Sequence, residues 1–135
     1  MKSDRTQIAH LFRRAGFGAT PEELDDFLII DEENLVDNAR LMGDELLAGL
    51  GELSERLDSI SNVRGRGLFA AFTLPSQQMR DTFHANALDA GMLSLKSGME
   101  SIRLRPSLNI SADDVAEALS IFEQTAKGLE ADQVA

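Results

Sequence analysis

Two arginines, Arg103 and Arg105, stand one residue apart in the stretch "IRLRPSL" of a chain whose formal net charge is −10. Alternation along a β-strand would turn both arginines to one face and Ile102 and Leu104 to the other. A guanidinium is planar and can hold a carboxylate through two parallel hydrogen bonds, whereas a lysine ammonium acts as a point charge. The pair is therefore a candidate anion site. The alternative is that both arginines lie on a solvent face and pair with acidic neighbours.

Other residues that could do chemistry are scattered. The stretch "RGRG" at residues 64–67 fits neither a dinucleotide-binding nor a P-loop glycine pattern, and its glycines favour a tightly packed strand. His10 and His84 have no carboxylate or hydroxyl partner near them in the sequence, which predicts ordinary surface or boundary histidines. Lys96 falls in a predicted turn, and a turn is too wet for a Schiff-base lysine. Cysteine is absent, so no thiolate metal site can form.

Composition excludes several classes of protein. The 23 acidic residues against 13 basic ones, with no Trp or Tyr, disfavour binding to nucleic acid. The apolar runs are short and the N-terminus is polar, so we expect a soluble cytoplasmic protein that neither crosses nor binds a membrane. With 135 residues, 43% of them hydrophobic, the chain can form one domain with a core of its own.

The first half of the chain predicts helices. The first thirty residues favour two short helices, the second starting at the capping sequence "TPEE" of residues 20–23. A long helix is expected from about Asp31 to Leu57, because apolar residues recur there every three or four positions. Glycines interrupt this helix, each costing about 1 kcal/mol relative to alanine, so it needs tertiary packing. They are Gly43, Gly49 and Gly51.

The second half predicts a small sheet. Residues 62–75 favour one strand buried on both faces, and a helix starting at Ser76 should follow, with Met79, Phe83, Ala87 and Leu88 inward. "MLSL" and "SIRLRPSL" favour a hairpin whose turn, Lys96 to Met99, contains Gly98. Ser111 caps a last helix, and residues 130–135 are expected to fray. The fold class is α+β: a partly antiparallel sheet of about three strands with helices on one face, preceded by two short helices and one long helix.

Three segments in this order resemble a known family. They are "EENLVDNARLMGDELLAGLGEL", "NVRGRGLFAAFTLPS" and "SIRLRPSLNIS". Together they resemble the C-terminal small domain of class III pyridoxal-phosphate aminotransferases, most closely the lysine 6-aminotransferases. The resemblance covers residues 28–129. Residues 1–27 are instead similar to the opening of an uncharacterised bacterial family, which implies an unrelated N-terminal segment, an aminotransferase-like domain and a frayed tail at 130–135.

The resemblance implies a role for one arginine. In this family the arginine at the position of Arg103, three residues before Pro106, helps to hold a carboxylate of glutamate or 2-oxoglutarate, whereas Arg105 has no matching role. The family's large domain supplies the Schiff-base lysine and the rest of the pyridoxal-phosphate site. The sequence lacks a counterpart of that domain, so we expect a truncated or fused aminotransferase that binds no cofactor alone, has no catalytic residues and is inactive alone.

An alternative of another class stays open. Small α+β sheets can serve as amino-acid-binding or dimerisation modules, and an apolar surface left exposed would favour association. The expected partners are therefore a dicarboxylate, a second copy of the chain, or a large domain supplied by another chain.

Overall fold

A computed structural model describes residues 32–134. The chain divides into two compact units, Met1–Asn38 and Ala39–Ala135, and the core and site described below belong to the second. The two short helices predicted in the first thirty residues lie outside the described residues, as do His10 and the predicted boundary after residue 27. Those expectations remain predictions.

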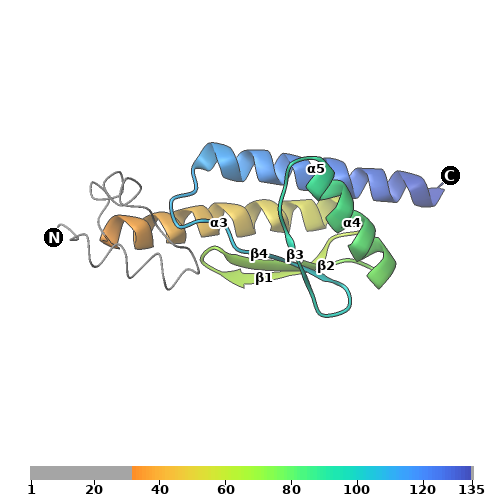
Figure 1. The fold of residues 1–135 in the computed structure, drawn as a ribbon, viewed down its shortest axis with the longest axis horizontal. Coiled ribbons are helices and arrows are strands. Elements are labelled where there is room, and N and C mark those ends of the chain that lie inside the picture. The colour runs from red at the N-terminus through yellow and green to blue at the C-terminus, as the bar shows by residue number, and fades with distance from the viewer. Residues whose placement is uncertain (1–31, 135) are drawn as a thin grey trace. The chain divides into compact units, whose positions relative to one another are not determined.

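The described residues form three helices and one antiparallel sheet, so the predicted α+β class is confirmed (Figure 1). The sheet has four strands in the order β1-β2-β4-β3, one strand more than the sequence predicted. The elements in chain order are α3 (Glu32–Arg56), β1 (Ser61–Arg66), β2 (Phe69–Thr73), α4 (Gln77–Asp89), β3 (Leu95–Ser97), β4 (Ser101–Leu104) and α5 (Ala112–Val134).

The additional strand is β1. The single strand predicted over residues 62–75 is a hairpin, in which Arg66 pairs with Phe69 across the two-residue loop of Gly67 and Leu68. Gly67 has φ +57°, a left-handed conformation that glycine adopts without steric cost. The chain therefore reverses in the middle of the stretch that was expected to run straight.

Strands β2 and β4 lie side by side in the middle of the sheet. Their register pairs Ala70 with Leu104 and Phe72 with Ile102, and all four side chains are buried. The opposite face of β2 is open, because Phe69 is 62% exposed. The prediction that both faces of this strand are buried is therefore wrong, and only one face of the sheet contributes to the core.

The β3–β4 hairpin differs from its prediction in register. Its turn contains Gly98 at φ +58°, as the sequence indicated. However, β3 begins at Leu95 and not at Met92, and Lys96 lies inside the strand, paired with Ile102. The predicted turn began two residues too early, because residues 95–97 continue the ladder opposite β4 and the turn occupies residues 98–100.

Caps define the other two helices. The hydroxyl of Ser76 accepts a hydrogen bond from the Met79 amide at the start of α4, as expected. At the start of α5, Ser111 and Asp114 exchange reciprocal bonds between side chain and backbone. One detail differs from the sequence prediction, because Leu88 is exposed on α4. Helix α5 continues to Val134, and the expected fraying of residues 130–135 stays a prediction.

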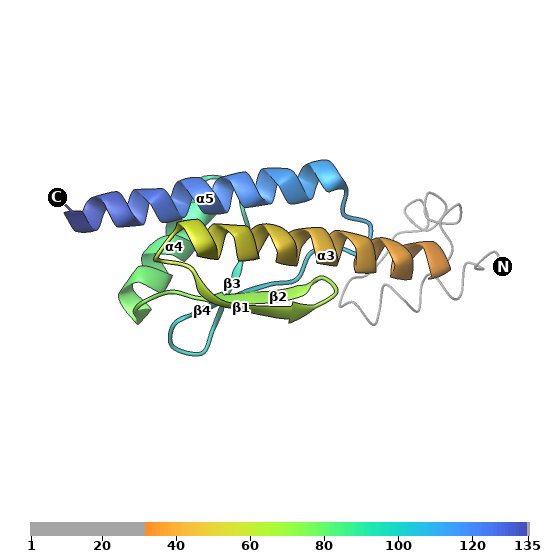
Figure 2. The ribbon, with the colours of Figure 1, turned by 180° about the vertical axis from the view of Figure 1, so that it is seen from behind.

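All three helices pack on the same side of the sheet, with α3 and α5 side by side (Figures 1 and 2). The centre of the core is a cluster of three phenylalanines from β2, α4 and α5. Phe72 meets Phe83 and Phe122 edge-on at centroid distances of 5.4 and 5.6 Å, and Phe83 stacks on Phe122 at 5.8 Å. This cluster fixes β2, and with it the neighbouring β4, against the helices.

Candidate functional site

Arg103 lies on β4, on the face of the sheet that no described helix covers. The strand alternates as predicted: Ile102 and Leu104 are buried, while Arg103 and Arg105 are exposed. The register pairs Arg103 with Ala71 on one side and with Leu95 on the other. The backbone ladder on both sides therefore fixes the direction in which Arg103 projects.

Two further arginines reach the same face from β1. Arg64 pairs with Ala71 and Arg66 with Phe69, and directly paired residues project to the same side of a sheet. We call this side the arginine face. It comprises Arg64, Arg66, Arg103 and Arg105 around Phe69. The two arginines of "RGRG" were not among the site residues predicted from the sequence, where only the glycines of this stretch gave a signal.

Arg64 ties three strands together. Its guanidinium donates to the carbonyl of Asn62 at 2.8 Å, to the hydroxyl of Thr73 at 3.2 Å and to that of Ser101 at 3.1 Å. All three acceptors are neutral, so these bonds orient the guanidinium without cancelling its charge.

Arg105 lies over the ring of Phe69, with 5.7 Å between its guanidinium carbon and the ring centroid. The quadrupole of an aromatic ring attracts a cation at this distance, by about 0.5–1 kcal/mol at an exposed site. The contact holds Arg105 down on the sheet, leaving the more central Arg103 without an aromatic partner.

None of these four arginines forms an ion pair with a described carboxylate. The alternative weighed from the sequence was half right, because the arginines lie on a solvent face. Its second half was wrong within residues 32–134, because no acidic neighbour pairs with them. The arginine face therefore keeps its positive charge for a ligand from outside this part of the chain.

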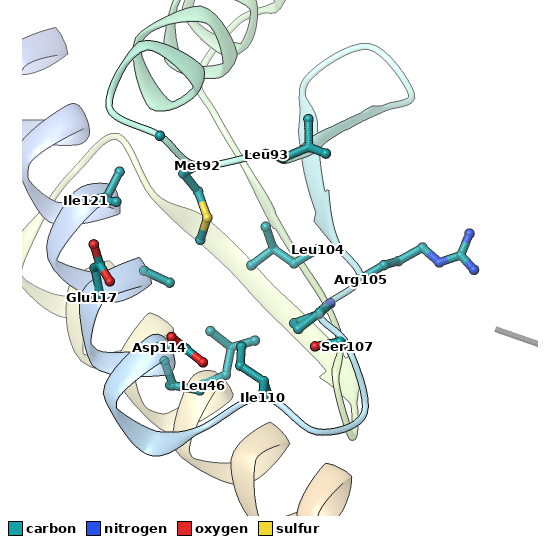
Figure 3. Close-up of a pocket in the computed structure, with 14 residues that line it drawn as sticks. Leu46, Met92, Leu93, Leu104, Arg105, Ser107, Ile110, Asp114, Glu117 and Ile121 are labelled. Atoms are coloured by element: carbon teal, nitrogen blue, oxygen red, sulfur yellow. The ribbon is translucent and has the colours of Figure 1, made fainter. Parts of the chain in front are cut away.

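Behind the end of β4, on the helix side, is a groove of about 290 Å³ (Figure 3). Its walls include Met92, Leu104 and Ile121, and its charged side chains from α5 are Asp114 and Glu117. Arg105 borders the groove but its side chain points away from it, as Figure 3 shows. Because both carboxylates would repel an anion, the groove does not suit a dicarboxylate.

The remaining candidates have structural partners. His84, which lacked a partner near it in the sequence, has its Nδ1 3.1 Å from the hydroxyl of Ser94. Ser94 is buried, so the pair joins α4 to the start of the hairpin and presents no reactive hydroxyl to solvent. A Cβ added at Gly65 would overlap the backbone of Phe69. This close approach agrees with a structural role for the "RGRG" glycines.

A second polar group, which the sequence analysis missed, positions the β3–β4 turn. Arg80 on α4 is 5% exposed and donates to the Gly98 carbonyl and to Asp81, both at 2.8 Å. Lys96 on β3 approaches the same Asp81 carboxylate at 3.1 Å. The hydrogen bond from Lys96, aided by the charge of Arg80, holds the pKa of Asp81 below its ordinary value although partial desolvation opposes it.

This group predicts how stability depends on pH. A carboxyl whose folded pKa is lowered stabilises the protein above its unfolded pKa, about 3.9, and that stability is lost as the pH falls through the folded pKa. We expect Asp81→Asn to flatten the acid limb of the curve of unfolding free energy against pH below about pH 4, as measured by urea denaturation. Asp89→Asn on the same helix is the control. An unchanged acid limb in Asp81→Asn would contradict the assignment.

Neither a metal site nor a membrane-spanning helix is found between residues 32 and 134. Within this range no group of three His, Asp or Glu side chains could hold a metal ion. No helix there has the length and apolar character needed to span a membrane.

Comparison with known proteins shows the family. Residues 23–126 match the family model of class III aminotransferases, so the chain belongs to that family. It is 41% identical over 95 residues to an acetylornithine aminotransferase from Gloeobacter violaceus, covering 70% of this chain and 24% of that protein. Identity is also 41% over 95 residues to the mitochondrial 4-aminobutyrate aminotransferase of Sus scrofa, covering 70% of this chain and 19% of the relative.

Solved structures show similarity to the same family. The fold is similar to that of lysine aminotransferase from M. tuberculosis in the internal aldimine form, with a TM-score of 0.71 and 27% identity over 78% of this chain and 24% of that one. A transaminase from the marine bacterium Virgibacillus gives a TM-score of 0.73 at 26% identity, covering 84% and 28% of the two chains. The chain spans about a quarter of the length of these proteins.

Class III aminotransferases use pyridoxal phosphate, which they hold through a lysine. The lysines among the described residues do not suit this role. Lys96 pairs with Asp81, and Lys127 pairs with Glu123 at 2.8 Å with a side chain that is 59% exposed. A Schiff-base lysine needs a desolvated pocket around its amine, whereas both of these side chains are exposed and lie in ion pairs.

Proposed function

We propose that this chain provides the small domain of a class III aminotransferase, in which Arg103 holds a carboxylate of glutamate or 2-oxoglutarate. The observation that carries the proposal is the exposed Arg103 on the central strand β4, with no ion pair to a described carboxylate. Because no described carboxylate neutralises the guanidinium of Arg103, its two parallel N–H donors remain available to a ligand.

The amine donor is the finer part of the proposal. We infer lysine, supported by the fold similarity to the lysine aminotransferase. The other relatives are named for acetylornithine and 4-aminobutyrate, so these two amines are the competitors to compare with lysine. The cofactor would supply the electron sink for the reaction, and its lysine has to come from outside residues 32–134.

The test is a titration of the full chain with 2-oxoglutarate, followed by NMR. We expect saturable binding that weakens at least about tenfold in Arg103→Gln, because a hydrogen-bonded charge pair contributes about 1.5–3 kcal/mol. Arg105→Gln, two residues along with the same change in charge, is the matched control and should bind nearly as well as the wild type. No saturable binding, or equal losses in both variants, would contradict the role of Arg103.

The second candidate, a dimerisation module, is supported by exposed apolar side chains at Leu93 and Met99, which are 76% and 71% exposed. Large apolar side chains in such positions favour association when they lie in one patch. Analytical ultracentrifugation of the same samples separates the two candidates. A concentration-dependent oligomer without 2-oxoglutarate binding would favour the dimerisation module.

A further inference from the structure

We propose that three residues of α4, namely Arg80, Asp81 and His84, are positioning residues for Arg103. They hold the β3–β4 hairpin in the place from which Arg103 binds a substrate carboxylate. The proposal rests on the proposed role of Arg103 and adds side chains that do not touch the ligand. The contacts that carry it all lie within residues 71–104, which the structure describes without a gap.

Three neighbouring side chains of α4 contact every second residue along β3 and its turn. The contacts are His84 Nδ1 to the Ser94 hydroxyl at 3.1 Å, Asp81 to the Lys96 ammonium at 3.1 Å, and Arg80 to the Gly98 carbonyl at 2.8 Å. Positions 80, 81 and 84 share one face of a helix, and alternate residues of a strand point to one side of it. Helix α4 therefore holds the hairpin at three successive points, which we call the α4 clamp.

Strand β3 depends on such contacts because it buries none of its own side chains. It is an edge strand of three residues, Leu95–Ser97, and none of the three is buried. Elements with few buried apolar contacts open locally at a low free energy, well below that of global unfolding. The ladder to β4 and the α4 clamp must therefore supply most of the attachment of β3.

The charged part of the clamp provides direction more than stability. Arg80 is 5% exposed, and its guanidinium donates both to the Gly98 carbonyl and to Asp81. Well-packed apolar residues often stabilise a protein as much as a buried ion pair does. The rigid fork of the guanidinium, however, fixes the turn and the Asp81 carboxylate together, and Asp81 in turn holds Lys96.

The clamp lies on the helix side of the sheet and does not compete for Arg103. Lys96 pairs with Ile102, whose side chain is buried against the helices, so Lys96 projects to the same side. No residue of the four strands is Asp or Glu, in a chain that has 23 acidic residues. The carboxylate that holds the hairpin therefore comes from α4, and the sheet separates it from the guanidinium of Arg103.

Leu95 connects the clamp to Arg103. The two residues pair directly across β3 and β4, so both project to the arginine face, and Ala71 pairs with Arg103 on the other side. The long side chain of Leu95 and the short one of Ala71 leave Arg103 more room over β2 than over β3. With β3 held in place, Arg103 has fewer rotamers open to it, so less conformational entropy is lost when a carboxylate binds.

The test is the affinity of the full chain for 2-oxoglutarate at neutral pH, measured by NMR titration. Asp81→Asn keeps the shape of the side chain but breaks the charged part of the clamp. We expect it to weaken binding about threefold to fivefold, because the apparent dissociation constant rises as the population of the held hairpin falls. Loss of a negative charge alone predicts the opposite, tighter binding of an anion. Asp89→Asn, the same change on the same helix, is the matched control and should not weaken binding.

Amide hydrogen exchange separates positioning from a loss of overall stability. In Asp81→Asn we expect exchange at the protected amides of the β3–β4 ladder to speed up at least about tenfold, with little change in α3. Arg80→Lys is the second variant. It keeps the positive charge but loses the fork that spans Gly98 and Asp81, so it should show the same pattern of exchange and the same weaker binding.

Three results would overturn the positioning role. They are unchanged or tighter binding of 2-oxoglutarate by Asp81→Asn, an equal loss of affinity in Asp89→Asn, and an even rise in exchange throughout the molecule. A wild-type chain that does not bind 2-oxoglutarate would contradict the proposed role of Arg103, and the positioning role with it. Wild-type binding that Asp81→Asn leaves intact would contradict the positioning role alone.

Discussion

Gly43→Ala is expected to destabilise the protein by about 3 kcal/mol, although alanine is the better helix former. A Cβ at Gly43 would overlap the backbone of Gly67, where α3 crosses the loop of the β1–β2 hairpin. Backbone atoms cannot rotate away as a side chain can, so either the helix must shift or the hairpin loop must open. Urea denaturation followed by circular dichroism measures the change in unfolding free energy.

Gly51→Ala on the same helix is the matched control. A Cβ at Gly51 meets no atom within 4 Å, so the substitution should stabilise the protein by about 0.5–1 kcal/mol through helix propensity alone. The two substitutions are chemically identical and should differ in sign. If Gly43→Ala were neutral or stabilising, α3 would not be in direct backbone contact with the hairpin loop.

Phe72→Ala is expected to cost about 3–5 kcal/mol, which is a large share of the total stability of a small domain. Phe72 is fully buried and contacts both Phe83 and Phe122, so its removal leaves a cavity between β2, α4 and α5. Thermal unfolding followed by calorimetry should show a strongly lowered midpoint, or no cooperative transition at all.

Phe69→Ala, three residues earlier on the same strand, provides the comparison. Phe69 is exposed and Arg105 is its recorded partner, so its loss should cost no more than about 1 kcal/mol. Equal effects at the two positions would mean that β2 does not have one buried and one open face.

Much of the fold could be predicted because its signals are local. The long helix was placed within a residue at each end, since an apolar residue every three or four positions specifies a helix regardless of its surroundings. The inward direction of Ile102 and Leu104 followed from alternation alone. Caps at Ser76 and Ser111 depend on residue types that satisfy the first amides of a helix.

The missed strand β1 lacked such a signal. It is an edge strand whose only large apolar side chain is Val63, so neither face shows an alternating pattern. The available clue was the Gly67-Leu68 pair between two extended stretches, which is the chemistry of a two-residue hairpin loop. The clue is weak, because the glycines of Arg64 to Gly67 are equally compatible with the entry to a tightly packed strand.

The candidate site could be predicted only in part, since its geometry depends on contacts between distant residues. Alternation alone placed Arg103 and Arg105 on one face of the sheet. Arg64 and Arg66 join them there only because β1 and β4 both lie next to β2. Likewise, the burial of Arg80 depends on the Gly98 carbonyl, eighteen residues away along the chain. No periodicity in a single sequence specifies which strands become neighbours.

The separation of charge between sheet and helices gives the second compact unit a permanent electric dipole, positive at the arginine face and negative toward the acidic residues of the helices. A carboxylate that approaches the protein is repelled by the acidic helices and attracted by the arginine face, so its diffusion is biased toward the sheet before any contact forms. The range of this guidance is set by the ionic strength, about 10 Å at 0.1 M. Approach from the helix side is therefore disfavoured by charge repulsion, without any structural barrier.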